Sequence, residues 1–486
     1  MDSKWPEVSI EEIKASSRNA IAMGPFGSRI KAENFVEDGV PVIKGGNLTG
    51  DFIVEDKFDF LSEEKADELK ASNAFRRDIV ITHRGTIGQV GIIPDDSKFE
   101  RYVVSQSQLK VTLDKEKVNP YFIYYFLRSP VGQHRLLMNA SQVGVPAIAQ
   151  ASTSVKSIMV PYPEKEIQNK IVEIILGLDH KIHKNRQINQ TLEAMAQAIF
   201  KSWFVDFEPV KAKISAIEAG EDAEGVIRAA MCAISGKTNE ELDQLQAKQP
   251  ENYIQLKTTA KLFPSSMLDS DFGEIPERWE VNHLGKFLDI LETGQRPKGG
   301  VSKITEGVPS VGAENIIGIG NYDYGKEKFV SREFFEKLNR GKIEPEDVLL
   351  YKDGGKPGDF RPRVSYFGFG FPYSEFAINE HVFRLRSEIL GQPFLYLSIG
   401  HERSLADLRQ KGGKAAIPGI NQTEVKTVLM LRPTSELLNC FNVLVGKIFE
   451  KILKNSLEIF RLATLRDTLL PKLLSGELSI GISEFM

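Results

Sequence analysis

An internal repeat with a period near 270 residues constrains this chain of 486 residues more than any other feature. Residues 39–43 (GVPVI) recur as 307–311 (GVPSV), and the strand-like run 78–81 (DIVI) recurs as 347–350 (DVLL). Each strand-like run leads into a basic, glycine-rich loop. This period is too long for a solenoid of small units, so it predicts two copies of one domain. Short β runs punctuated by Gly and Pro predict an irregular α+β fold in each copy.

A long amphipathic helix is predicted after each copy, because apolar residues there follow alternating steps of four and three, the spacing of a helix–helix seam. The first seam consists of Ile167, Ile171, Ile174, Leu178, Ile188, Leu192, Met195 and Ile199. The second consists of Leu438, Phe441, Val445, Ile448, Ile452, Ile459 and Leu462. Lys181 and Asn185 interrupt the first seam, and Asn455 interrupts the second one period later. A buried Asn fixes the register of paired helices. If a pseudo-twofold relates the halves, the helices form an antiparallel coiled coil; the alternative is that each packs on its own domain.

Charge and composition leave a nucleic-acid partner open. The net charge is −4, but residues 208–251 hold nine acids and five bases, so the rest of the chain is neutral and its loops can carry basic stripes. Only two cysteines occur, Cys232 and Cys440, without metal-ligand spacing around either. No apolar run approaches the roughly 18 residues of a membrane span, and no signal-peptide layout stands at the start. These features predict a cytoplasmic protein without disulfides, zinc or a membrane anchor.

Three segments resemble the conserved regions of type I restriction–modification specificity (S) subunits. They are residues 198–209 (AIFKSWFVDFEP), 465–478 (LRDTLLPKLLSGEL) and 273–281 (GEIPERWEV), and Trp5 stands where the first domain would open. The resemblance covers nearly the whole chain, in order and at the expected spacing. It implies two duplicated α/β target-recognition domains, each followed by a long helix. The predicted divisions are 1–163 (first recognition domain), 164–208 (first helix), 209–270 (acidic linker or insertion), 271–433 (second recognition domain), 434–478 (second helix) and 479–486 (tail).

The resemblance also implies the partners of the chain. Each recognition domain would read one part of a split double-stranded DNA site, and the helices would set the gap between the parts. Two copies of an adenine-N6 methyltransferase subunit would use S-adenosylmethionine, and motor–nuclease subunits would use ATP and magnesium. This chain would have no cofactor, metal site or catalysis of its own. The residues expected to dock partner subunits are Trp203, Phe204, Asp206, Phe207, Leu469 and Leu473.

DNA recognition needs side chains that make paired hydrogen bonds with base edges, together with cations and backbone amides for phosphates. Glycine-rich loops let the backbone approach a phosphate closely. In the first domain these criteria select the loop 24–29 with Ser28 and Arg29, then Lys44, Asn47, His83, Arg84, Thr86, Gln106 and Gln108. In the second domain they select Gln295, Arg296, Lys298, Asn315, Lys352, Lys356, Arg361, Arg363, Lys411 and Lys414. The aromatic cluster at 121–126 is expected to pack in a core rather than to stack on bases.

Several short matches to catalytic motifs fail on inspection. Residues 119–122 (NPYF) lack the second proline of an amino-methyltransferase site, and 367–370 (FGFG) lack the spacing of its cofactor loop. Residues 235–238 (SGKT) end like a P-loop, but the required earlier glycine is Met231. Two alternatives remain open: a self-contained methyltransferase or nuclease with a divergent site, and a sequence-specific DNA-binding protein that acts without a methyltransferase.

Overall fold

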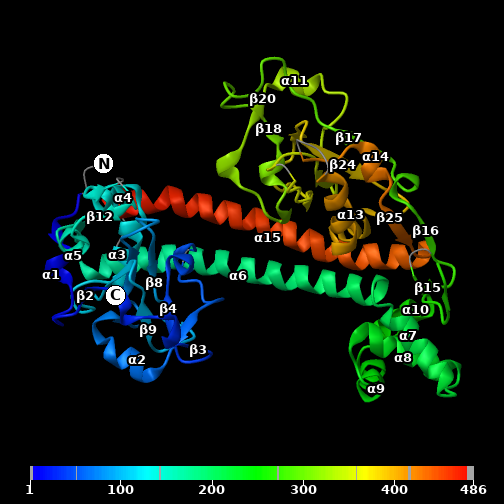
Figure 1. The fold of residues 1–486 in the computed structure, drawn as a ribbon, viewed down its shortest axis with the longest axis horizontal. Coiled ribbons are helices and arrows are strands. Elements are labelled where there is room, and N and C mark those ends of the chain that lie inside the picture. Colours follow the sequence, from blue (N-terminus) through cyan, green and yellow to red (C-terminus); the bar gives the residue numbers. More distant parts are fainter. Residues whose placement is uncertain are drawn as a thin grey trace, which may run out of the picture. The chain divides into compact units, whose positions relative to one another are not determined.

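The computed structural model describes residues 4–50, 52–141, 144–270, 273–356, 358–413 and 418–478, apart from the side chain of Ser28. The chain divides into two compact units (Figure 1). Unit 1 comprises Met1–Ile182 and Arg461–Met486, and unit 2 comprises His183–Phe460. The two long helices each contribute residues to both units.

Unit 1 contains two main sheets and two separate strand pairs, one of them formed by β11 (Ala140–Ser141) and β12 (Ala147–Ile148). The four-stranded sheet has the order β2-β10-β7-β8, with antiparallel neighbours: β2 (Ile21–Met23), β10 (Gln108–Val111), β7 (Ile79–Thr82) and β8 (Val90–Ile92). The five-stranded sheet has the order β3-β5-β4-β9-β6, with β4 and β9 parallel: β3 (Phe35–Val36), β5 (Asp59–Leu61), β4 (Val40–Ile43), β9 (Tyr102–Val104) and β6 (Asn73–Ala74). The first strand, β1 (Glu7–Ser9), pairs with the last, β13 (Met159–Pro161).

Unit 2 repeats the central part of this topology: its second sheet has three strands instead of five, and its first sheet gains β19 (Gly318–Ile319). Its five-stranded sheet, β17-β24-β21-β22-β19, begins with four strands that match β2-β10-β7-β8: β17 (Ile290–Thr293), β24 (Val382–Arg386), β21 (Val348–Tyr351) and β22 (Val364–Tyr366). Its three-stranded sheet, β20-β18-β23, matches β5-β4-β9 and keeps the parallel pair: β20 (Phe329–Val330), β18 (Val308–Val311) and β23 (Ala377–Ile378). The pair β16 (Glu280–His283) and β25 (Leu429–Arg432) matches β1 and β13. The repeat in the sequence is therefore a duplication of the fold.

Helices cover these sheets, and their sequence explains where they begin. In α3 (Pro120–Arg128), Pro120 occupies the first turn and Asn119 Oδ1 accepts a hydrogen bond from Tyr121 N at 3.0 Å. Phe122 and Tyr124 are fully buried, as expected for core packing. The other helices of the two domains are α1 (Ile10–Ile13), α2 (Glu63–Glu68), α4 (Pro130–Leu137), α5 (Ala151–Lys156), α11 (Arg332–Glu336), α12 (Gln392–Gly400), α13 (Glu402–Gly412) and α14 (Gln422–Lys426).

The long helices are α6 (Lys165–Phe204) and α15 (Ser435–Ser475), and their parts within unit 2 pair antiparallel (Figure 1). Asn185 Nδ2 donates to Glu458 Oε2 at 2.9 Å, and Asn455 Nδ2 donates to Asn189 Oδ1 at 2.9 Å. At the C-terminal end of α6 and near the N-terminal end of α15, Phe204 packs against Phe441 with ring centroids 4.9 Å apart. The predicted interruptions Asn185 and Asn455 are thus buried between the helices and hydrogen-bonded, which fixes the helix register, whereas the third, Lys181, is exposed.

The predicted first seam needs a correction. Ile174 is 40% exposed and Met195 is 49% exposed, whereas their neighbours Ile175 and Ala196 are fully buried. The buried stripe is shifted because α6 packs against the domain cores as well as against α15. In unit 1, for example, Ile171 and Ile175 belong to the same apolar cluster as the α3 aromatics.

The acidic segment between the halves, expected to be a linker or insertion, folds as four helices with a small core. These helices are α7 (Glu208–Glu218), α8 (Ala223–Ser235), α9 (Asn239–Lys248) and α10 (Pro250–Lys261), and they gather beyond the C-terminal end of α6 (Figure 1). The core consists of Ala230, Met231, Leu242, Tyr253 and Ala260. Across the described part of the chain, no helix combines the length and apolar character needed to cross a membrane.

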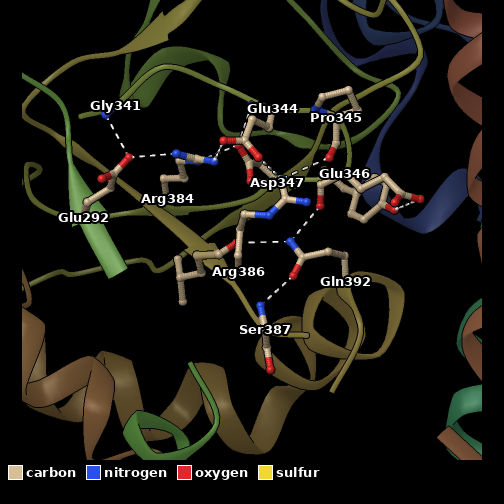
Figure 2. Close-up of polar contacts among 12 residues, drawn as sticks. Glu292, Gly341, Glu344, Pro345, Glu346, Asp347, Arg384, Arg386, Ser387 and Gln392 are labelled. Atoms are coloured by element: carbon tan, nitrogen blue, oxygen red, sulfur yellow. Dashed lines mark hydrogen bonds and ion pairs between the residues drawn. The ribbon is translucent and has the colours of Figure 1, made fainter. Parts of the chain in front are cut away.

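A buried charged cluster supports the central strand of unit 2 (Figure 2). Asp347, fully buried just before β21, accepts a hydrogen bond from Arg384 Nε at 2.6 Å and one from Arg386 Nη1 at 2.8 Å. Arg384 also pairs with Glu292 at 3.0 Å and Glu344 at 2.8 Å. Burial raises the pKa of Asp347 to about 6, and the charge of Arg384 limits that rise. The guanidinium groups thus keep a buried carboxylate ionised at neutral pH.

Replacement of Arg384 by methionine should destabilise unit 2 by about 3–5 kcal/mol, because it leaves Asp347 buried without its main counter-charge. The pKa of Asp347 is higher in the folded state than in the unfolded state, so ionisation of this carboxyl group lowers the free energy of unfolding as the pH rises towards 6. Without Arg384 the carboxyl group ionises at a higher pH, and the free energy of unfolding continues to fall above pH 6. The gap between wild type and R384M should therefore be larger at pH 8 than at pH 5 in guanidinium unfolding curves. R332M, which removes an exposed arginine paired with Glu375, is the control, and an equal loss in both variants would contradict the assignment.

Phe441→Ala should cost about 3–5 kcal/mol of unfolding free energy, because its fully buried ring packs against Phe200, Trp203 and Phe204. The fluorescence of buried Trp203 reports this core during denaturation. Val443→Ala on the same helix, at a side chain 53% exposed, should cost little. Similar losses for the two variants would show that α15 does not pack as described.

Candidate nucleic-acid interface

The loop after β7 in unit 1 and the loop after β21 in unit 2 are held by the same backbone hydrogen bonds. Gly85 N donates to Pro146 O at 2.8 Å, and Gly354 N donates to Pro418 O at 2.9 Å. These contacts correspond one to one, so Arg84 and Asp353, which precede the two glycines, occupy equivalent positions.

The residue directly before β10 in unit 1 and the residue directly before β24 in unit 2 are held in the same way. His83 N donates to Ser107 O at 3.0 Å, and Lys352 N donates to His381 O at 2.9 Å. Each unit thus has one pair of these hydrogen bonds, and we call this pair the loop frame. By this correspondence Ser107 matches His381, and the preceding residue, Gln106, matches Glu380.

A third segment enters each site through a glycine that no other residue can replace. A Cβ on Gly24 would lie 1.9 Å from the carbonyl oxygen of Ser105, and a Cβ on Gly294 would lie 1.8 Å from that of Ile378. The chain therefore passes directly against the neighbouring strand end in both units, and the residues after each glycine are brought beside the loop frame.

In unit 1 these segments enclose a groove of about 520 Å³. No acidic residue is among the described residues that line it. They are Pro25, Gly27, Ile30, Phe35, Val42, Lys44, Gly45, Thr82, Arg84, Thr86, Gln89, Ser105, Gln106, Ser107 and Gln108. The groove offers a guanidinium, an ammonium, amides and hydroxyls, which are the groups that recognise base edges and phosphates.

Four predicted residues with exposed side chains line this groove: Lys44, Arg84, Thr86 and Gln106. The predicted Gln108 also lines it but is buried, and Pro25 and Gly27 of the predicted loop 24–29 belong to the lining as well. Lys44 is partly held in place, because Nζ pairs with Asp59 and lies 5.2 Å from the centre of the Phe35 ring.

The sequence prediction missed Gln89, Ser105 and Ser107. Gln89 Oε1 accepts a hydrogen bond from Thr82 Oγ1 at 3.0 Å, and Thr82 Oγ1 accepts one from Gln108 Nε2 at 3.2 Å. These groups form a polar floor to the groove. Each of these three residues lies directly beside a strand end in the repeat, and this position is the sequence signal that could have identified it.

Three predicted residues of unit 1 have structural contacts instead. Asn47 is buried, and its Nδ2 donates to Val54 O and Lys57 O, both at 3.0 Å, which closes its own loop. His83 is buried with Nε2 3.2 Å from Gln106 O, and burial lowers its pKa. Gln108 is almost completely buried in the floor. Arg29 is exposed but does not line the groove, and the Ser28 side chain lies outside the described residues.

Unit 2 has an equivalent groove of about 390 Å³ with different chemistry. Its lining consists of Gln295, Arg296, Pro297, Gly299, Gly300, Val301, Ser302, Ile304, Ser310, Glu327, Lys328, Asn379, Glu380 and His381. Of the predicted residues, Gln295 and Arg296 line it. Two carboxylates also line it, in contrast to the groove of unit 1.

The other residues predicted in unit 2 divide into internal contacts and exposed positions. Asn315 is buried like its counterpart Asn47, and its Oδ1 accepts from Asp323 N at 2.7 Å. Lys352 Nζ donates to Glu380 O at 3.1 Å, the same carbonyl position that His83 contacts in unit 1.

Arg363 Nη2 donates to Ala313 O at 2.9 Å and Lys411 Nζ pairs with Asp407 at 2.6 Å, so both are internal. Lys298, Lys356 and Arg361 are exposed outside the lining, and Lys414 is not among the described residues.

The residues expected to dock partner subunits are mostly buried within the chain. Trp203, Phe204 and Phe207 belong to the core of unit 2, where Trp203 packs edge-on against Phe263 at 5.2 Å and Phe207 against Trp279 at 5.7 Å. Leu473 is 2% exposed in the core of unit 1, against which the half-buried Leu469 also packs. Asp206 pairs with Lys201. The docking role of these residues stays a prediction.

The sequence of the chain is similar to those of known proteins. The family model described as Type I restriction modification DNA specificity domain matches residues 21–194. The specificity subunit of the type I restriction enzyme HindI from Haemophilus influenzae is 33% identical over 79% of this chain and 83% of its own length. The MjaIX specificity subunit from Methanocaldococcus jannaschii is 23% identical over 83% of this chain and 78% of its own length.

A solved structure shares the fold. The crystal structure of a type I restriction–modification S subunit from M. genitalium aligns over 97% of this chain and 96% of its own, with a TM-score of 0.53 and 15% identity. At this identity the likeness concerns the fold alone.

Arg84→Ala should weaken binding of the assembled complex to double-stranded DNA and lower the slope of log affinity against log salt by up to about one. Arg101→Ala, which removes an arginine tied to Glu63 and Asp67 outside the groove lining, should leave both quantities unchanged. Tyr124→Ala should instead lower the unfolding temperature, because its ring is fully buried. Unchanged affinity and salt dependence in Arg84→Ala would remove this loop from the interface.

Proposed function

The chain belongs to the family of type I restriction–modification specificity subunits, and we propose that each of its two grooves reads one part of a split double-stranded DNA site. Members of this family recognise DNA sequence. The observation that carries the bipartite reading is the pair of equivalent grooves: one loop frame, built twice, holds different side chains in each copy.

The chemistry of the grooves supports base reading. An arginine donates two hydrogen bonds to guanine O6 and N7, and glutamine pairs with the N6 and N7 edge of adenine in the major groove. Arg84 and Gln106 stand side by side on the frame of unit 1, where no lining acid repels phosphates. Because the corresponding positions of unit 2 are Asp353 and Glu380, the two parts of the site differ in sequence.

The partners in this proposal are two adenine-N6 methyltransferase subunits and the motor–nuclease subunits. S-adenosylmethionine, ATP and magnesium belong to those partners, and the chain itself performs no catalysis. Trp203, Phe204 and Phe207 lie in the core of unit 2, and their predicted docking role is part of this proposal.

Methylome sequencing tests the proposal directly. A host that expresses this chain with its neighbouring methyltransferase gene should carry N6-methyladenine in one bipartite motif, and deletion of the gene for this chain should abolish it. Adenine methylation that does not depend on the gene would contradict the proposal. Sequence-selective binding by the chain in that case would favour a DNA-binding protein that acts alone.

A further inference from the structure

The reading groups of the two grooves come from different loops. In unit 1 the arginine, Arg84, stands on the loop after β7, and the second residue after Gly24 is Phe26. In unit 2 the position of Arg84 is taken by Asp353, and the second residue after the equivalent Gly294 is Arg296. An arginine therefore lines each groove, but it comes from a different segment of the chain in each unit.

In unit 2 this arginine is paired with an acid that lines the same groove. Arg296 Nη1 lies 3.3 Å from Glu380 Oε1, and both residues line the groove. The Arg296 side chain is 66% exposed and that of Glu380 is 30% exposed, so the guanidinium faces outward and the carboxylate lies below it. An ion pair this exposed contributes little to stability, which leaves both groups available to exchange partners with a ligand.

Two further residues hold Glu380 in position. His381 Nε2 lies 3.6 Å from Glu380 Oε1, while His381 Nδ1 contacts Asp353 Oδ1. Asp353 Oδ2 also pairs with Lys352 Nζ at 3.0 Å. Burial opposes ionisation of Asp353, but hydrogen bonds from His381 and Lys352 outweigh it and lower its pKa. Basic and acidic groups thus alternate in the order Lys352, Asp353, His381, Glu380 and Arg296. This chain of contacts holds the Arg296–Glu380 pair on the loop frame.

We propose that the Arg296–Glu380 pair reads one G·C base pair in the part of the site bound by unit 2. Arg296 donates to guanine O6 and N7, and Glu380 accepts from the N4 amino group of the paired cytosine. These are the matching groups of the two bases in the major groove, and an acid beside the arginine disfavours a phosphate as its target. Asp353 and His381 are positioning residues. This inference rests on the proposed function.

The test uses the full complex with its methyltransferase and a library randomised across both parts of the site. Arg296→Ala should reduce discrimination at a single G·C position of one part about 10- to 100-fold and leave the other part unchanged. Arg296→Lys keeps the charge without the two-pronged geometry, so it should retain affinity better than alanine and still lose discrimination. Glu380→Gln should change the preference at that same position, because an amide no longer favours cytosine.

Arg332→Ala is the matched control, since Arg332 is an exposed arginine paired with Glu375 at 2.8 Å on α11 (Arg332–Glu336), outside the groove lining. It should leave the motif unchanged. Uniform weakening of all sequences by Arg296→Ala, with a lower salt slope and an unaltered motif, would assign Arg296 to a phosphate and overturn the proposal. So would an unaltered motif in both Arg296→Lys and Glu380→Gln. If wild type itself yields no bipartite motif, the proposed function fails instead.

Discussion

The backbone hydrogen bonds of the loop frame are the constraint on which both grooves depend. Gly85 and Gly354 donate to the carbonyls of Pro146 and Pro418, so a loop and a distant segment close in the same way in each unit. Because main-chain groups make these contacts, side chains at the frame are free to differ without loss of the closure. One scaffold can therefore carry Arg84 in one copy and Asp353 in the other, which is what a protein that reads two different sequences requires.

Beneath the frame, each unit buries an acid next to a base at equivalent strand positions. Burial raises the pKa of Asp78 and lowers that of Lys110 in unit 1, and the charge of each partner opposes the shift. In unit 2, Asp347 and Arg384 take these places with additional acids around the guanidinium (Figure 2). A buried pair of this kind is weak evidence for stability, but loss of one partner is costly. It ties the central strand to its neighbour, so the loop that follows starts from a rigid base.

The helices show how far periodicity predicts packing. The second seam, including Phe441, Val445 and Ile452, is buried as expected, and Asn185 and Asn455 lie in the helix pair. The first seam is displaced at Ile174 and Met195, since heptad spacing assumes a single partner and α6 has several. The aromatic residues expected to dock partner subunits lie in the core of unit 2 for a related reason. Large aromatic residues pack in any buried apolar environment, and the sequence alone does not distinguish the protein's own core from an interface with a partner.

By itself, the sequence determined the duplication, the two long helices and the family, because each depends on repeated local patterns or on residues contiguous in the chain. It also identified Arg84, Gln106 and Arg296 as groove residues, since polar residues beside strand ends and glycines are exposed by the fold. Only the tertiary structure decided that Asn47, His83 and Asn315 are internal and that Glu380 and His381 stand beside Arg296. The His83–Gln106 contact and the Arg296–Glu380 pair join segments that are distant in the chain and meet through strand pairing, and no local pattern reports which segments meet.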